Sequence, residues 1–159
     1  MLDVIFSIKF LHVLAATVMV GTWLCLAAFM VMAHRASNTS VVALTSSFVV
    51  MLEKVLIAAA FALVPLSGFP LATAIGVSPF GEFWLIVSLV LYVGILAAWI
   101  FALRVEIRIR DLTRDAALNR APLSQDYHRL FRLWCMLAGP MLAAMVAVLA
   151  LMIWQPRFD

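Results

Sequence analysis

Charged side chains are scarce in this sequence. Lys, Arg, Asp and Glu make up 12% of the 159 residues, whereas a soluble domain carries about 25%. Hydrophobic residues make up 67%, and the mean hydropathy is +1.14. This balance excludes a soluble globular enzyme, a disordered chain and a nucleic-acid-binding module. The pI of about 9.3 reflects a net charge of only +3, so no nucleic-acid partner is predicted.

The common catalytic and metal-binding motifs are also missing. The two cysteines, Cys25 and Cys135, lie in apolar runs without a CxxC spacing, which excludes a zinc site and a disulfide framework of the usual kinds. There is no phosphate-binding glycine loop, no HExxH and no nucleophile elbow. The nine methionines form no ligand cluster and suit apolar filling. No metal site is predicted, and whether the protein is an enzyme stays open.

Four apolar runs are long enough to cross a bilayer, which takes about 20 residues in a helix. They cover residues 10–33, 55–76, 83–103 and 133–154, and only His12 interrupts the first. The runs predict an all-α fold, an integral membrane four-helix bundle that forms one domain over residues 1–159. The first run is too long for a signal peptide and lacks a basic flank, so we expect it to remain in the mature protein.

The basic residues are distributed unequally between the two sides of the predicted bundle. Nine of the eleven Lys and Arg lie in or beside the first-to-second and third-to-fourth connections, and only Lys9 and Arg157 lie on the other side. Cytoplasmic loops carry the excess of Lys and Arg in membrane proteins. We therefore expect both longer basic connections in the cytoplasm and both termini outside.

Local signals predict where the helices begin and pair. The polar residues 37–40 offer N-caps for the second helix, and Ser124 offers one for the fourth. Ser78-Pro79 predicts the start of the third helix, because proline suits the first helical position. That helix should continue beyond the bilayer, where Glu106 and Arg110, four residues apart, could pair.

Prolines and small residues are the remaining features of the spans. Pro65, Pro70 and Pro140 predict kinks or local unwinding, because proline lacks the N–H that a helix needs. Such breaks can mark a cavity, or they can be purely structural. Small residues recur every fourth position in 94–102 and 139–147, which allows close helix approach. These faces could serve the bundle itself, a homodimer or a partner membrane subunit.

His12 is the main ionisable residue inside a span, and such residues are candidates for function by default. A neutral imidazole there could bind a metal or haem iron. It could equally be a histidine hydrogen-bonded to another helix. His34 and His128 lie at the opposite ends of their spans. His12 and His34 are separated by about 33 Å of helix rise, so they cannot share one haem.

A basic group is predicted at the cytoplasmic side. It contains Lys54, Arg129 and Arg132, together with His128. Such a group could bind lipid phosphate or the carboxylates of an amphipathic substrate. The alternative is that these residues only set the topology and solvate the surface.

Two segments carry a family resemblance. One runs from Lys9 through Leu11-His12 to Gly21-Thr22-Trp23, and the other runs from Tyr127-His128-Arg129 to Gly139-Pro140. With Glu53-Lys54 they resemble the small bacterial integral-membrane family called domain of unknown function 2269. That resemblance implies a multi-pass protein of the bacterial inner membrane and no defined biochemical role.

A more distant likeness is to HemJ, the membrane protoporphyrinogen oxidase family, which also has four spans and is linked to haem b. It rests on Leu11-His12 through Gly21, on Ala33-His34-Arg35, on Met51 to Lys54 and on Phe131-Arg132. HemJ has an Asn between that Arg and the following Pro, whereas residues 133–139 contain none. CopD-type copper-resistance proteins share the His-then-Gly-x-Trp pattern of the first span.

These observations leave several functions open. One is a haem-b-binding redox protein with His12 as the axial ligand, or with His34 or His128 in that role and Lys54 and Arg132 holding the propionates. The alternative is a non-enzymatic accessory or scaffold protein of the bilayer. Uncharged spans and an absence of paired carboxylates within the membrane favour the alternative. Transport and copper handling are further readings of the same chain.

Overall fold

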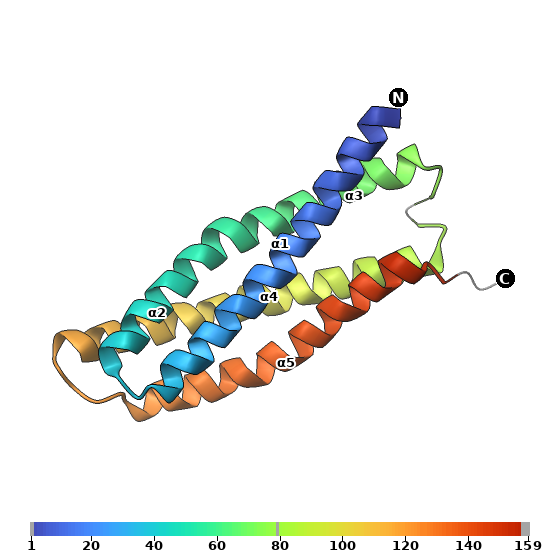
Figure 1. The fold of residues 1–159 in the computed structure, drawn as a ribbon. Helices are drawn as coiled ribbons and strands as arrows, with labels where there is room; N and C mark the ends of the chain where they lie inside the picture. The colour runs from blue at the N-terminus through green and yellow to red at the C-terminus, as the bar shows by residue number, and fades with distance from the viewer. Residues whose placement is uncertain (1, 79, 157–159) are drawn as a thin grey trace.

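The computed structural model describes residues 2–78 and 80–156, and within them all regular structure is helical. Helix α1 (Leu2–Arg35) is followed by a continuous rod made of α2 (Thr39–Leu52), a π-helical segment η1 (Glu53–Ile57) and α3 (Ala58–Ala74). Helices α4 (Phe83–Leu118) and α5 (Gln125–Trp154) complete the bundle (Figure 1). All four rods are long and apolar enough to cross a membrane, as predicted.

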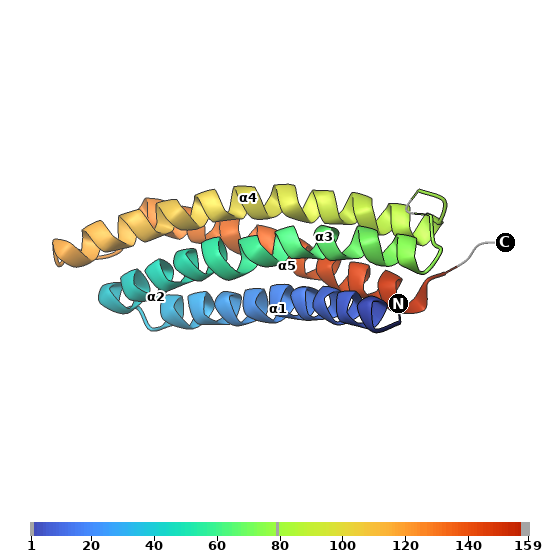
Figure 2. The same cartoon turned by 90° about the horizontal axis from the view of Figure 1, so that it is seen from above.

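The rods form an antiparallel bundle. Helix α1 packs on α3, α2 packs on α4, and α4 packs on α5, whereas α1 and α5 make little contact. Seen from above, α1 and α4 lie on opposite sides with the other two rods between them (Figure 2). The start of α1 and the end of α5 lie at the same end of the bundle, and we call this the terminal end. The opposite end, with the connections 36–38 and 119–124, is called the basic end.

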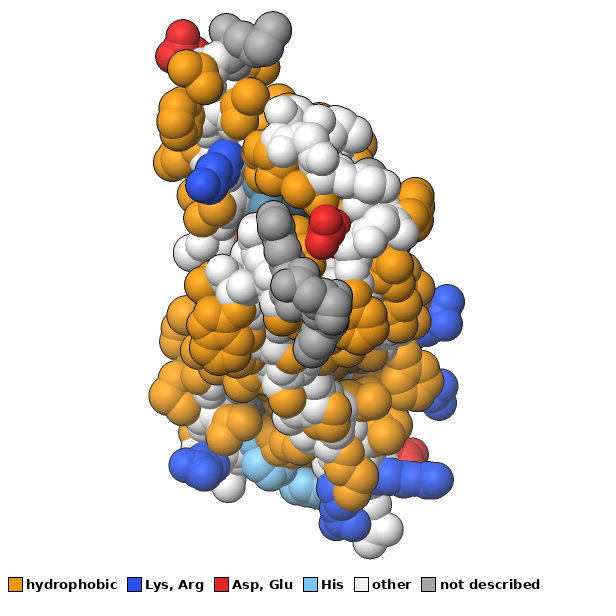
Figure 3. Space-filling view, turned by 90° about the vertical axis from the view of Figure 1, so that its right-hand side faces the viewer, with side chains coloured by type: hydrophobic (Ala, Val, Ile, Leu, Met, Phe, Trp, Pro, Cys, Tyr) orange, Lys and Arg blue, Asp and Glu red, His pale blue; other side chains and the backbone are white. Residues whose placement is uncertain are grey.

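Most of the interior is apolar, and so is most of the surface. One core cluster centres on Trp23, Ile57, Ile95 and Met145, and a second lies nearer the basic end. Large hydrophobic side chains are exposed all along the rods, and Figure 3 shows them covering most of one face, with Lys and Arg gathered toward one end. An outward apolar surface of this extent suits contact with lipid.

The caps decide where the helices begin. Asn38 accepts hydrogen bonds from the backbone N–H of Ser40 and Val41 at 3.0 and 3.3 Å. Ser124 accepts one from Tyr127 at 3.2 Å, which confirms its predicted role.

The predicted start of the third helix was wrong. α4 begins at Phe83 with Glu82 as its N-cap, because the chain first turns through Gly76, whose φ is +76°, and through a turn closed by Gly81 N–H on the Ser78 carbonyl. Pro79 and Arg157 lie outside the described residues.

Pro65 and Pro70 lie inside α3 and Pro140 inside α5, and both helices continue through them. Local unwinding was expected at these prolines, but the irregular segment is η1, which precedes them. At Pro65, a neighbouring side chain replaces the missing hydrogen bond of the helix. The proline nitrogen carries no hydrogen, so it cannot donate to the Phe61 carbonyl. The Tyr92 hydroxyl on α4 donates a hydrogen bond to that carbonyl instead. The Phe61 carbonyl therefore has a hydrogen-bond partner although Pro65 cannot supply one.

The two small-residue faces have different surroundings. On α4, Ala102 is buried in the core while Gly94 is exposed. On α5, Gly139, Ala143 and Ala147 are all exposed. The α4 face thus serves the bundle in part, whereas no other helix of the chain covers the α5 face.

Candidate functional site

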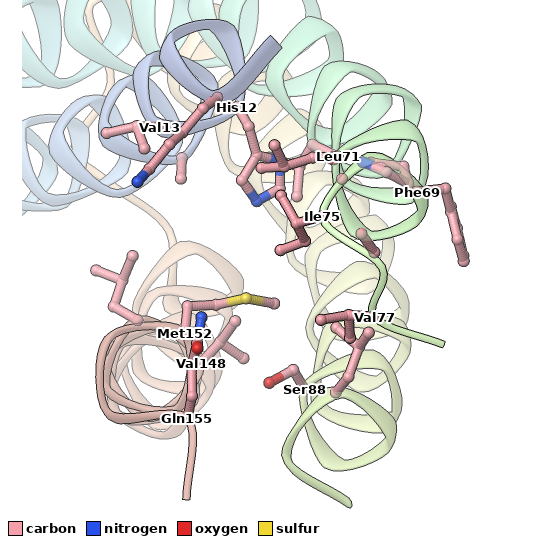
Figure 4. Close-up of a pocket in the computed structure, with 18 of the residues that line it drawn as sticks. His12, Val13, Phe69, Leu71, Ile75, Val77, Ser88, Val148, Met152 and Gln155 are labelled. Atoms are coloured by element: carbon pink, nitrogen blue, oxygen red, sulfur yellow. The ribbon is translucent and has the colours of Figure 1, made fainter. Parts of the chain in front are cut away.

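A cavity of about 640 Å³ opens between the rods at the terminal end. Residues of α1, α3, α4 and α5 line it, together with the connection after α3. Most of the lining is apolar, and the polar groups include Lys9, His12, Ser88, Tyr92 and Gln155. It forms where α1 and α5 diverge, and Figure 4 shows side chains from both helices facing across it. Ligand pockets typically have volumes of about 300–1,000 Å³ with few polar groups.

His12 is the polar group held most firmly in this cavity. It is half-buried, and its Nδ1 lies 3.0 Å from the Val64 carbonyl oxygen and 3.0 Å from Ser67 Oγ. A carbonyl can only accept, so Nδ1 carries the proton. The Ser67 hydroxyl donates to the Leu63 carbonyl at 2.6 Å, which leaves its oxygen free to accept from Nδ1. The imidazole is thereby fixed in one tautomer.

That tautomer leaves Nε2 with a lone pair. Among the residues that the structure describes, none forms a hydrogen bond with Nε2. Figure 4 shows the ring directed into the space between the helices. A histidine whose other ring nitrogen donates to a backbone carbonyl is the arrangement found at metal ligands. The same figure shows the Met152 side chain entering the cavity from α5.

Gly68 allows α1 to approach α3 closely at this point. A Cβ at position 68 would lie 3.0 Å from Cε1 of His12. No ordinary side chain fits there without moving the imidazole. Gly68 therefore makes room for His12.

His34 and His128 lie together at the basic end, far from this cavity. His34 Nδ1 is 2.9 Å from the Tyr127 hydroxyl, and its ring stacks on Phe131 with centroids 3.9 Å apart. The rings of His34 and His128 are 5.8 Å apart, edge to face. Neither histidine lines the terminal-end cavity, and His34 belongs to an aromatic cluster.

Lys54 and Arg132 are exposed and line neither this cavity nor the apolar groove between α1 and α2. Lys54 lies in η1 and Arg132 on α5. The structure thus brings the two inner histidines together and leaves the predicted cationic groups on the surface. The roles of His12, His34, His128, Lys54 and Arg132 in cofactor binding stay predictions.

Two buried glutamates were missed by the reasoning from sequence. Glu53 in η1 and Glu106 on α4 are each 2% exposed. Trp99 Nε1 donates to Glu53 Oε2 at 2.5 Å, and Trp134 Nε1 donates to Glu106 Oε1 at 2.7 Å. Glu53 thus reaches across to α4, where Trp99 lies two helical turns before Glu106 on the same face.

One expectation is corrected by these contacts. Glu106 does not pair with Arg110, because its side chain points into the bundle, and Arg110 instead pairs with Asp111 at 2.8 Å. Both glutamates are buried in the bundle at positions just outside the apolar runs 55–76 and 83–103. The signal was available as periodicity, since Glu106 shares a helix face with the buried positions 99, 102, 109 and 113.

The helices and their apolar exteriors define a multi-pass helical membrane protein. Over residues 6–156 the chain matches the family described as predicted integral membrane protein (DUF2269), and it belongs to that family. None of the curated proteins and none of the solved structures matches it.

Proposed function

We propose that this membrane protein binds haem b in the terminal-end cavity, with His12 Nε2 as an axial ligand of the iron. The observation that carries the proposal is the fixed imidazole, whose Nδ1 is held by the Val64 carbonyl while Nε2 faces an apolar cavity of about 640 Å³. The bacterial inner membrane is the proposed location. The distant likeness to HemJ points to the same cofactor.

The residues present fit the chemistry of such a group. His12 supplies an imidazole nitrogen from α1, and Met152 supplies a thioether from α5 on the same cavity. Imidazole and thioether groups both hold haem iron in other proteins. When bound, haem supplies one-electron chemistry. The apolar lining would bind the porphyrin faces and exclude water.

Among the described residues, Lys9 is the one cation that lines this cavity, where it would lie beside the anionic edge of the ligand. Lys54 and Arg132 do not line it, so we do not assign propionate binding to them. Lys9 is exposed at the cavity mouth, where its long side chain can reach the interfacial region of a bilayer. A ligand with its apolar ring inward and its carboxylates at Lys9 would match the polarity of the site.

The test is an absorption spectrum of detergent-purified protein from cells supplied with ample haem, as isolated and after dithionite. We expect a Soret band, with α and β bands on reduction, at near-stoichiometric haem. His12→Ala should abolish these bands. The matched controls His34→Ala and His128→Ala should retain them, because neither side chain lines the cavity.

A featureless spectrum would overturn this proposal. An accessory role would then lead, since the exposed face of Gly139, Ala143 and Ala147 on α5 is a close-packing surface that no helix of the chain uses. Partner subunits or a second copy would be sought by co-purification. Retention of haem in His12→Ala with loss in His34→Ala would instead move the site to the basic end.

A further inference from the structure

The interior of the bundle holds a carboxyl oxygen with no partner. Glu106 is 2% exposed, and its Oε2 has no hydrogen-bond partner in the part of the chain that the structure describes. Glu53, from the neighbouring rod, is equally buried. Removing an uncompensated carboxylate from water is strongly unfavourable, and in practice such a group takes up a proton. Glu53 reaches Trp99, two helical turns from Glu106 on the same face of α4. A second buried carboxyl group in the same part of the interior disfavours ionisation of both.

No cation compensates these charges. The Lys and Arg on the packed elements nearest the pair are exposed, or bonded elsewhere in the case of Arg110. Helix α1 has no charged residue between His12 and Arg35 apart from His34, which bonds to Tyr127. Within the described residues neither glutamate forms an ion pair. The cations on these elements are Lys54 on η1, Arg104, Arg108 and Arg110 on α4, and Arg129 and Arg132 on α5.

The tryptophans fix both side chains in place without neutralising them. Each indole N–H donates one hydrogen bond to one carboxyl oxygen. Glu53 begins the π-helical segment, and single π turns inside α-helices are frequent at functional sites. The pair is therefore preorganised and retains an open position at Glu106 Oε2.

Two buried hydroxyls lie between the glutamates and the basic end, beyond the buried apolar residues Val49 and Ile109. Ser46 lies seven residues before Glu53, and Thr113 lies seven residues after Glu106, about 10 Å along each helix and on the same face. The two hydroxyls are 3.0 Å apart and buried. They join α2 to α4 in line with the two glutamates, whereas an apolar cluster around Ile57 and Ile95 separates the pair from the terminal-end cavity.

We propose that Glu53 and Glu106 form a proton-binding site, which holds one proton near neutral pH and exchanges it with water at the basic end past Ser46 and Thr113. The proton goes to a carboxylate oxygen and no other bond changes. The site would give the protein an internal proton acceptor. It does not depend on whether the terminal-end cavity binds haem.

The experiment is infrared spectroscopy of the full-length protein in detergent near neutral pH, in H2O and in D2O. We expect a C=O stretching band of a protonated carboxylic acid that shifts in D2O. Glu106→Gln or Glu53→Gln should remove at least half of its intensity, while the control Glu82→Gln should leave it unchanged. A band absent at neutral pH, or unaffected by both site variants, would overturn the proposal. A band that appears only when Na⁺ and K⁺ are removed would identify a cation site instead.

A second version of the infrared experiment leaves Glu53 and Glu106 unchanged. It therefore also applies if the Gln variants do not fold. The chain has three glutamates, so Glu82→Gln protein labelled with carbon isotope only at glutamate reports on Glu53 and Glu106 alone. The neutral-pH band must then show the isotope shift, and a band without that shift contradicts the proposal.

The exchange route is tested by the rate of the D2O shift. Thr113→Val should slow the shift several-fold, because it removes the hydroxyl without changing the shape. Thr17→Val, an exposed position in the terminal half of α1, should not change the rate. Equal rates in the wild type and Thr113→Val would exclude the path past Ser46 and Thr113.

Discussion

Tyr92 shows how one side chain makes a proline acceptable inside an apolar helix. Its hydroxyl donates a hydrogen bond to the Phe61 carbonyl. Pro65 lacks the N–H that would otherwise donate to this carbonyl. Tyr92→Phe should destabilise the protein by about 1–3 kcal/mol, the cost of an unsatisfied buried polar group. The measurement is unfolding of the detergent-solubilised protein in a denaturing detergent.

The double-mutant cycle with Pro65→Ala isolates this contact. Alanine at position 65 restores the N–H four residues after Phe61, so Tyr92→Phe should cost much less in that background. An equal cost in both backgrounds would show that the Tyr92 hydroxyl contributes in some other way.

At the residue scale the sequence alone finds His12 but not its setting. A lone histidine in an apolar run is visible without a structure, whereas its bonds to Val64 and Ser67 depend on how α1 packs against α3. Glu106 was assigned to a surface pair because its spacing to Arg110 suits one. That spacing does not say which face of α4 turns inward, and burial beside Trp134 was therefore missed.

At the scale of elements, the π-helical segment adjusts the second rod to the bundle. A π turn has one more residue per hydrogen-bonded turn than an α turn. The five residues of η1 therefore turn the chain about as far as one residue fewer of regular α-helix would, so the segment contains about one extra residue. Glu53 is buried at the first position of the segment and Ile57 at its last, so both parts of the rod keep their inner faces.

This geometry predicts that a residue can be deleted from η1. Removing Val55, which is 60% exposed, should convert the segment to regular helix and leave both inner faces in phase. Removing Leu66, which is 69% exposed but lies in regular α3, should rotate the rest of the rod by about 100° and displace Ser67 from His12.

The measurement is the yield of monodisperse protein and its unfolding midpoint in detergent. The Val55 deletion should fold with a moderately lowered midpoint, and the Leu66 deletion should not yield folded protein. The reverse order would refute the assignment of η1 as an accommodated extra residue.

The rods themselves were predictable from sequence, because apolar runs of bilayer length leave few alternatives. The start of α5 after Ser124 was predictable, because a capping side chain acts locally. The start of α4 did not, because the turn through Gly76 and Ser78 is set by the connection between two packed helices. The π segment has no signature in residues 53–57, whose composition suits an α-helix equally well.

At the scale of the whole molecule, two polar sites lie in one apolar bundle and are separated along its axis. The cavity with His12 is at the terminal end, and the paired carboxyl groups lie between the apolar cluster and the basic end. The proposed ligand and the proposed proton would reach the protein from opposite sides. The two sites can therefore be disabled separately, with His12→Ala leaving the infrared band intact and Glu106→Gln leaving the haem spectrum intact.

Which side each site faces depends on the orientation of the bundle. Nine of the eleven Lys and Arg lie at or near the basic end, and such an excess is retained in the cytoplasm. In a Cys25→Ala, Cys135→Ala background, Ser78→Cys should react with a membrane-impermeant thiol reagent in intact spheroplasts. Pro122→Cys, equally exposed but in the 119–124 connection, should react only after permeabilisation. The opposite pattern would place the His12 cavity on the cytoplasmic side and the exchange path of Glu53 and Glu106 on the outer one.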